Sequence, residues 1–216
     1  MKIEGPYRDR HQAGQILAES LQGQNLGVNP LVLGLPRGGV PVAREVADIL
    51  RAPLDVFIVR KLGVPNRPEL AMGAIASGDV KLLDEALIAE AGISKAEVET
   101  VLRREMEELR RREENYRPGN PPVISSRPVI VIDDGLATGF TMRAAITALR
   151  QAGCPRITVG VPVGPESTCE ELEQAVDLLV CPLRPEQFYA VGDWYEDFLA
   201  TSDEEVRACL ARRPAR

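Results

Sequence analysis

The stretch Val129-Ile-Val-Ile-Asp133-Asp134-Gly135-Leu-Ala137-Thr138-Gly139-Phe140-Thr141 carries the clearest structural signal in the chain. Its four apolar β-branched residues predict a short strand that is buried on both faces, as in a parallel sheet. Two adjacent acids follow the strand, and a turn of small residues then leads into a helix that should run to about Ala152. The stretch therefore predicts a strand–turn–helix unit with two carboxylates at the tip of the strand.

The turn has the composition of a phosphate site. Free backbone N–H groups and the helix dipole attract anions to a helix N-terminus. Thr138 and Thr141 add hydroxyl donors, Gly139 permits close backbone approach, and Asp133 and Asp134 can accept hydrogen bonds from a vicinal diol. Phosphate and diol together describe a ribose 5-phosphate. The alternative is an ordinary strand–turn–helix with a polar cap; neither a nucleotide P-loop nor a Gly-x-Gly-x-x-Gly pattern is found in the stretch.

Similar apolar runs lie on both sides of this unit. Residues 31–35, 54–59, 157–163 and 177–180 predict further strands, separated by predicted helices at 12–22, 40–50 and 167–175. Strands that alternate with helices predict an α/β fold with three layers, in which helices flank a central, mainly parallel sheet. Ligands are expected at the carboxyl ends of its strands. We expect one domain over residues 1–216.

Other segments interrupt the alternation. Residues 60–70 have the Gly, Pro and Asn content of a mobile loop, and residues 73–76 and 80–83 predict a small hairpin. Residues 84–117 predict a helical insertion, because Ser94 and Glu97 have capping-box spacing and open a helix that should reach Tyr116. Its Arg/Glu alternation is typical of a solvated helix face. Residues 118–122 should end that helix, and a terminal helix should start near Ser202.

The composition excludes several classes of function. The chain of 216 residues has one histidine, so a Ser–His–Asp, Cys–His or histidine–zinc site would depend on His11, which has the setting of a surface residue. The four cysteines form no Cys-x-x-Cys pair, and we expect free thiols. A net charge of -6 disfavours a nucleic-acid partner. Without an apolar leader or a run of about 18 apolar residues, we expect a cytoplasmic protein with no membrane contact.

The quoted stretch resembles the signature of the type I phosphoribosyltransferases, which use 5-phosphoribosyl 1-pyrophosphate. Their pattern is a hydrophobic strand, two acids and a Thr-Gly-x-Thr turn, and the wider resemblance covers most of the chain outside residues 84–122. It implies that Asp133 and Asp134 hold the ribose hydroxyls, with Gly135 beside them. It also implies that the 5-phosphate is bound by the turn, which consists of Ala137, Thr138, Gly139, Phe140 and Thr141.

Two further loops extend the resemblance. Leu35-Pro36-Arg37-Gly38-Gly39 is similar to the family's pyrophosphate loop, which implies a cis peptide bond between Pro36 and Arg37. Arg60-Lys61-Leu-Gly-Val-Pro is similar to the start of the flexible catalytic loop in adenine-type members. The resemblance makes Arg37, Lys61 and Asp134 the implied catalytic residues, since the departing pyrophosphate needs positive charge. The alternatives are a glycine turn that simply leads into a helix and cations that lie on the surface.

The resemblance also implies a magnesium ion and an acceptor site. Mg²⁺ would be carried by the sugar pyrophosphate, with Asp133 and Asp193 as acids that could join it. Residues 185–195 are similar to a segment of the hypoxanthine class, which implies a small hood over residues 182–200 whose Phe188, Asp193 and Trp194 contact the acceptor. An aromatic cluster is equally typical of a local core.

The acceptor itself is not fixed by the resemblance. Ala137 stands where hypoxanthine/guanine members carry an Asp, which disfavours a 6-oxopurine. We expect an enzyme that transfers phosphoribosyl to a nucleobase-like acceptor and releases pyrophosphate. The alternative is a regulatory protein that binds phosphoribosyl pyrophosphate or a nucleotide without turnover. The charged helix at residues 94–116 could serve an interface in a homo-oligomer.

Overall fold

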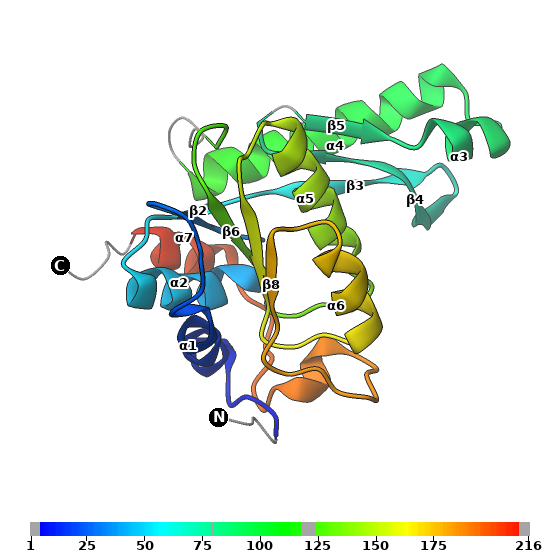
Figure 1. Ribbon diagram of the computed structural model, residues 1–216. Helices are drawn as coiled ribbons and strands as arrows, with labels where there is room; N and C mark the ends of the chain where they lie inside the picture. The colour runs from blue at the N-terminus through cyan, green and yellow to red at the C-terminus, as the bar shows by residue number, and fades with distance from the viewer. Residues whose placement is uncertain (1–4, 79, 118–123, 212–216) are drawn as a thin grey trace.

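A five-stranded parallel sheet forms the centre of the fold (Figure 1). The computed structural model describes residues 5–78, 80–117 and 124–211, so the segment 118–122 lies outside it. The strand order is β2-β1-β6-β7-β8, and the bounds are β1 (Leu31–Gly34), β2 (Leu54–Val56), β6 (Val129–Ile132), β7 (Ile157–Gly160) and β8 (Leu178–Val180). The predicted α/β class and the quoted strand are confirmed.

Helices cover both faces of this sheet, as alternation along the strands requires. Leu33 of β1 and Val131 of β6 face one helical layer, formed by α5 (Phe140–Gln151) and α6 (Glu166–Glu173). Val32 and Ile130 face the other layer, formed by α1 (Arg10–Leu21) and α2 (Gly39–Leu50). The strands are therefore apolar on both sides because both sides are buried.

The segment predicted as a mobile loop is instead part of a second sheet, so that prediction was wrong. Strands β3 (Val59–Val64), β4 (Arg67–Ala76) and β5 (Val80–Leu83) form an antiparallel sheet in that order. The turn-forming residues are concentrated at the tip of the β3–β4 hairpin, where Asn66 has a φ of 64°. Gly63 lies where the register of the β3–β4 pairing shifts, so this glycine is accommodated within the sheet. The smaller hairpin predicted from β4 to β5 is confirmed.

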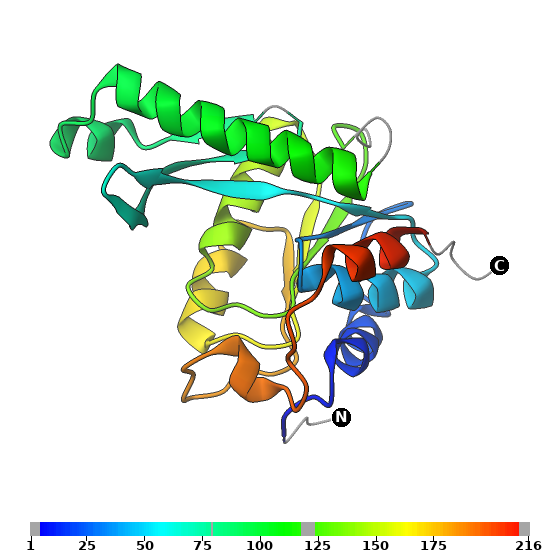
Figure 2. The same ribbon diagram turned by 180° about the vertical axis from the view of Figure 1, so that it is seen from behind.

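The predicted helical insertion consists of α3 (Glu85–Glu90) and α4 (Lys95–Tyr116). Figure 2 shows α4 running alongside the antiparallel sheet, next to the terminal helix α7 (Asp203–Ala211). Val98, Val101 and Leu109 on one side of α4 are buried against the antiparallel sheet and α7. Only the other side of α4 is the solvated face that its charges predicted. No helix within the described residues has the length and apolar character needed to cross a membrane.

The capping box at the start of α4 yields a first prediction. The Ser94 hydroxyl accepts from the Glu97 backbone N–H at 3.3 Å, and the Glu97 carboxylate accepts from the Ser94 backbone N–H at 2.9 Å. We expect Ser94→Ala to lower the free energy of unfolding by about 1 kcal/mol, because the Glu97 backbone N–H loses its acceptor and the capping box is broken. Chemical denaturation measures this. Ser167→Ala, an exposed serine inside α6, is the control and should change little.

Candidate active site

The loops that follow β1 and β6 touch at the carboxyl edge of the parallel sheet. The Leu35 backbone N–H donates to the Ile132 carbonyl oxygen at 2.9 Å. A methyl group added to Gly38 would lie 2.0 Å from Asp134 Oδ2, and one added to Gly39 would lie 2.7 Å from the Ile132 carbonyl oxygen. Such distances leave no room for any side chain. The two glycines of the 35–39 loop therefore let its backbone lie directly against the acidic pair.

Burial dominates the electrostatics of Asp133 and Asp134. It raises the pKa of Asp133 well above its ordinary value, and the negative charge of Asp134 raises it further. The pKa of Asp134 is also raised by burial, although the Arg10 guanidinium opposes that shift. Asp133 Oδ1 accepts a hydrogen bond from the Asp134 backbone N–H at 2.9 Å. The two acids therefore differ in their surroundings, because the Arg10 guanidinium acts mainly on Asp134.

Arg10, at the start of α1, is the cation that faces this pair. Its Nε and Nη2 atoms lie 2.9 and 2.8 Å from Asp134 Oδ2. The Tyr195 hydroxyl, from the region predicted as the hood, donates to the Asp134 backbone carbonyl oxygen at 2.6 Å. The sequence analysis gave neither residue a role, since they lie 124 and 61 positions from Asp134. Tyr195 ends the 185–195 segment that resembles the hypoxanthine class, whereas no motif includes Arg10.

The predicted phosphate turn occupies the N-terminus of α5. Gly139 is the N-cap with a φ of 69°, which only glycine adopts freely. Ala137, Thr138 and Thr141 are exposed, while Phe140 is half-buried. The Arg143 guanidinium donates to the Thr138 carbonyl oxygen, which places a further cation beside the turn. This cation is one helical turn beyond Gly139, and the sequence spacing could have revealed it.

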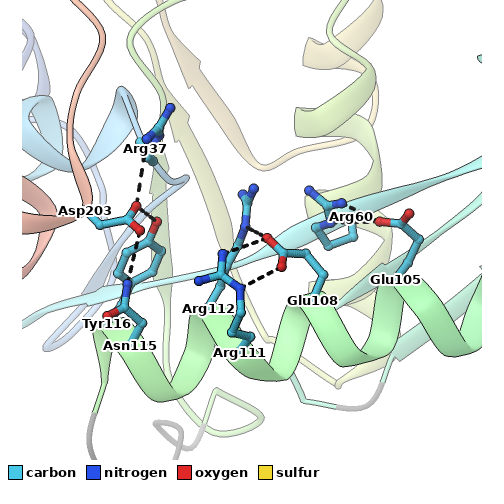
Figure 3. A network of polar contacts seen from close by, with 9 residues as sticks. All are labelled: Arg37, Arg60, Glu105, Glu108, Arg111, Arg112, Asn115, Tyr116 and Asp203. Carbon is cyan, nitrogen blue, oxygen red and sulfur yellow. Dashed lines mark hydrogen bonds and ion pairs between the residues drawn. The ribbon is translucent and has the colours of Figure 1, made fainter.

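Arg37 lies in the 35–39 loop, and its peptide bond with Pro36 is cis, which confirms that prediction. Its guanidinium lies 3.9 Å from the Asp203 carboxylate at the start of α7. Figure 3 shows that Asp203 also meets Tyr116 and Asn115 at the end of α4. The Tyr116 hydroxyl donates to Asp203 Oδ1 at 2.6 Å, and burial together with that carboxylate raises the pKa of Tyr116 to about 12. Tyr116 therefore remains a donor at neutral pH.

The structure does not bring Arg60 and Arg37 together. The Arg60 guanidinium pairs with Glu105 of α4, and Figure 3 draws it at the other end of the row of polar contacts from Arg37. Lys61 is exposed in β3, opposite Ala74 of β4. Neither residue stands at the tip of a parallel strand, because the chain leaves that sheet at Val56 and starts the antiparallel one at Val59.

The region predicted as the hood contains a short 3₁₀ helix, Val191–Trp194, within otherwise irregular backbone. Phe188 and Trp194 pack, partly buried, against a small core formed by residues such as Tyr7 and Tyr195. Asp193 is exposed. Gly135 adjoins this region, because a methyl group there would lie 2.5 Å from Val191 Cγ1. The aromatic cluster is thus a local core whose edge borders the acidic pair.

The phosphoribosyl transferase domain, as a family model, matches residues 10–191, which is most of the chain. The chain belongs to this phosphoribosyl transferase family. The family match contains the 35–39 loop, the acidic pair and the 137–141 turn, but stops short of Tyr195. All three loops named from the resemblance, at residues 35–39, 60–65 and 133–141, therefore lie within the matched part of this phosphoribosyl transferase domain.

Relatives agree with this assignment. Two Mycobacterium tuberculosis proteins, from strains CDC 1551 and H37Rv, are provisionally named phosphoribosyl transferases and are each 44% identical over 95% of this chain. The chain spans about half of their length, 46% in each case. The crystal structure of TT1426 from Thermus thermophilus is 40% identical, has a TM-score of 0.84, and is matched over 97% of this chain and 100% of its own.

Proposed function

We propose that the chain transfers phosphoribosyl from 5-phosphoribosyl 1-pyrophosphate to a nucleobase-like acceptor and releases pyrophosphate. One observation carries the proposal: the 35–39 loop and the acidic pair are in contact at the ends of adjacent strands. A sugar pyrophosphate presents a diol and a pyrophosphate on neighbouring carbons. The contact therefore supports a single ligand that spans the acids and the loop.

The residues of these loops would divide the work. Asp133 and Asp134 accept hydrogen bonds from the ribose hydroxyls, and the 137–141 turn donates backbone N–H and side-chain O–H groups to the 5-phosphate. The cis-linked 35–39 loop and Arg37 take the pyrophosphate. The bond from ribose C1 to the pyrophosphate oxygen breaks while a bond from C1 to an acceptor nitrogen forms, and the proton on that nitrogen leaves to solvent. Arg37 offsets the charge that the leaving group acquires.

Magnesium fits the chemistry of these donors. Carboxylate oxygens are the ligands that Mg²⁺ prefers, and this ion usually enters with phosphate substrates rather than in an all-protein cage. Asp133, whose carboxyl is buried beside the 35–39 loop, is the protein group best placed to join it; Asp193 is exposed on the 3₁₀ helix. When bound, the ion would neutralise charge on the pyrophosphate.

The acceptor would enter beside the hood. Phe188 and Trp194 border the acidic pair through Val191 and Tyr195, and the Trp194 Nε1 atom is buried without a hydrogen-bond partner among the described residues. A planar, nitrogen-containing ring offers both an apolar face and a polar edge to such a surface. Lys61 and Arg60, in the antiparallel sheet, would act only if the β3–β4 hairpin moves toward the site.

The reaction itself is the direct test. Purified protein is incubated with phosphoribosyl pyrophosphate, Mg²⁺ and a panel of purine and pyrimidine bases, and pyrophosphate release is measured. We expect release with at least one base and none without an acceptor. Tight binding of phosphoribosyl pyrophosphate without release for any base would support the regulatory alternative instead.

Two substitutions test the sugar site. We expect Asp134→Asn and Thr138→Ala each to weaken binding of phosphoribosyl pyrophosphate by about 1–3 kcal/mol, because the first removes a charged acceptor for the ribose and the second a hydroxyl donor for the 5-phosphate. Calorimetric titration measures the change. Thr147→Ala, an exposed threonine farther along α5, is the control. Unchanged affinity in both site variants would contradict the assignment of this site.

A further inference from the structure

The guanidinium of Arg10 is fully engaged between three segments of the chain. Two of its nitrogens contact Asp134 Oδ2, and the third, Nη1, donates to the Leu199 carbonyl oxygen at 2.8 Å. Its central carbon lies 4.0 Å from the centre of the Phe198 ring, which is a close cation–π distance. Only 11% of the Arg10 side chain and 15% of the Asp134 side chain are exposed. This is a largely buried ion pair in which each guanidinium nitrogen of Arg10 has a partner.

Both contacts of Arg10 with Asp134 fall on one carboxylate oxygen, Oδ2. Oδ2 faces Arg10 and the Gly38 backbone, where a methyl group would clash with it. That oxygen is therefore used within the protein, and a ligand would approach the other oxygen of the carboxylate. Arg10 thus fixes the orientation of Asp134 without standing in the path of a diol.

Arg10 distinguishes the two acids of the pair by contact. Its guanidinium binds Asp134 Oδ2, whereas Asp133 Oδ1 accepts from the Asp134 backbone N–H. The groups that face the pair are Arg10 from α1 and Tyr195 from the hood, with Tyr7 behind Tyr195. Arg37 of the 35–39 loop is paired with Asp203 instead. Arg10 is therefore the one cation among these groups that contacts a carboxylate of the pair.

Two partners of Arg10, Phe198 and Leu199, lie beyond the residues that the family model matches. The family match ends at residue 191, whereas Tyr195, Phe198 and Leu199 follow it. The hood of this chain is consequently fastened to the acidic pair twice: by Arg10, through Phe198 and Leu199, and by the Tyr195 hydroxyl on the Asp134 carbonyl. A displacement of the hood would be transmitted to Asp134.

We propose that Arg10 is a positioning residue of the sugar subsite, which holds the Asp134 carboxylate in one orientation and ties it to the hood. The inference deepens the proposed function and rests on it, because Asp134 matters only if the acids bind the ribose. Without the guanidinium, Asp134 Oδ2 would lose both of its contacts with Arg10, and the carboxylate would be free to rotate.

Binding of phosphoribosyl pyrophosphate with Mg²⁺ is measured by calorimetry at pH 7 for the wild type, Arg10→Gln and Arg10→Lys. We expect Arg10→Gln to bind about tenfold more weakly, the scale of one lost charged contact. Arg10→Lys keeps a charged donor for Asp134 and should recover most of the affinity, and thermal melting of each variant separates this effect from a loss of folding.

Two further variants make the result unambiguous. Arg8→Gln, whose arginine is exposed and pairs only with its neighbour Asp9 among the described contacts, should bind as the wild type does. Phe198→Leu keeps the ion pair and removes the aromatic face, so it should weaken binding about threefold. This variant tests the proposal should Arg10→Gln fail to fold.

The possible results separate the two proposals. A wild type that does not bind phosphoribosyl pyrophosphate would contradict the proposed function. A wild type that binds it, together with an Arg10→Gln variant of equal affinity, would overturn the role of Arg10 alone. Tighter binding by Arg10→Gln would also overturn that role, because Arg10 would then compete with the ligand for Asp134.

Discussion

Gly39→Ala should destabilise the protein and impair the sugar-pyrophosphate site at the same time. The added methyl group would lie 2.7 Å from the Ile132 carbonyl oxygen and 2.8 Å from the Asp133 Cα, and both are backbone atoms of the adjacent strand and its tip. A backbone cannot rotate away as a side chain can, so the 35–39 loop or the tip of β6 must shift. Overpacking of this kind costs about 3 kcal/mol.

The expected consequences are measurable in two ways. The melting temperature should fall by roughly 6–12 °C, as a loss of that size implies for a chain of this length. Affinity for phosphoribosyl pyrophosphate should fall about a hundredfold, because a displacement near 1 Å separates the loop from the acids. Gly5→Ala, whose methyl would meet nothing within 4 Å, should change neither quantity. A melting temperature within about 2 °C of the wild type, with intact binding, would contradict the tight contact described here.

Arg37→Ala should have the opposite profile, with a large loss of rate and little loss of stability. The Arg37 side chain is 48% exposed, and its ion pair with Asp203 is long at 3.9 Å. An exposed pair contributes at most about 1 kcal/mol to folding. The guanidinium is nevertheless in the loop proposed to hold the leaving pyrophosphate, where removal of one electrostatic stabiliser costs about 10²–10³-fold in kcat.

Pyrophosphate release under saturating substrate measures this rate, and thermal melting provides the comparison. Arg103→Ala removes an equal charge from an exposed position on α4 and should leave both quantities unchanged. If Arg37→Ala retained a wild-type kcat, the assignment of the leaving-group site to the 35–39 loop would have to be abandoned, whatever its effect on substrate binding.

The quoted stretch illustrates how much local sequence can determine. Val129–Ile132 forms the buried strand, and Gly139 begins the helix with the positive φ that its residue type permits. The cis bond before Arg37 was also expected, although from the resemblance rather than from any physical pattern. The strand and the turn depend on residues that are neighbours in the chain, so the local pattern contains the information needed to predict them.

The loop predicted for residues 60–70 was wrong for a specific reason. Gly63, Pro65 and Asn66 occur in loops and in hairpin turns alike, and no local pattern distinguishes the two. In the structure, pairing with β4 and packing of Leu62 and Val64 into the core with α4 decide for the hairpin. The hairpin also places Arg60 beside Glu105 of α4, 45 residues away, and no motif predicts this pair.

The sequence by itself determined the α/β layering, the acidic tip of β6 and the glycine turn at α5, because each follows from local periodicity or from the conformational freedom of a residue type. Only the tertiary structure decided that β1 lies beside β6, which brings the 35–39 loop against the acids. It alone also joined Arg10 and the hood to Asp134. Such contacts depend on strand order and burial across the whole chain. An ion pair or a close glycine contact forms only between groups that the fold places within a few ångströms of each other.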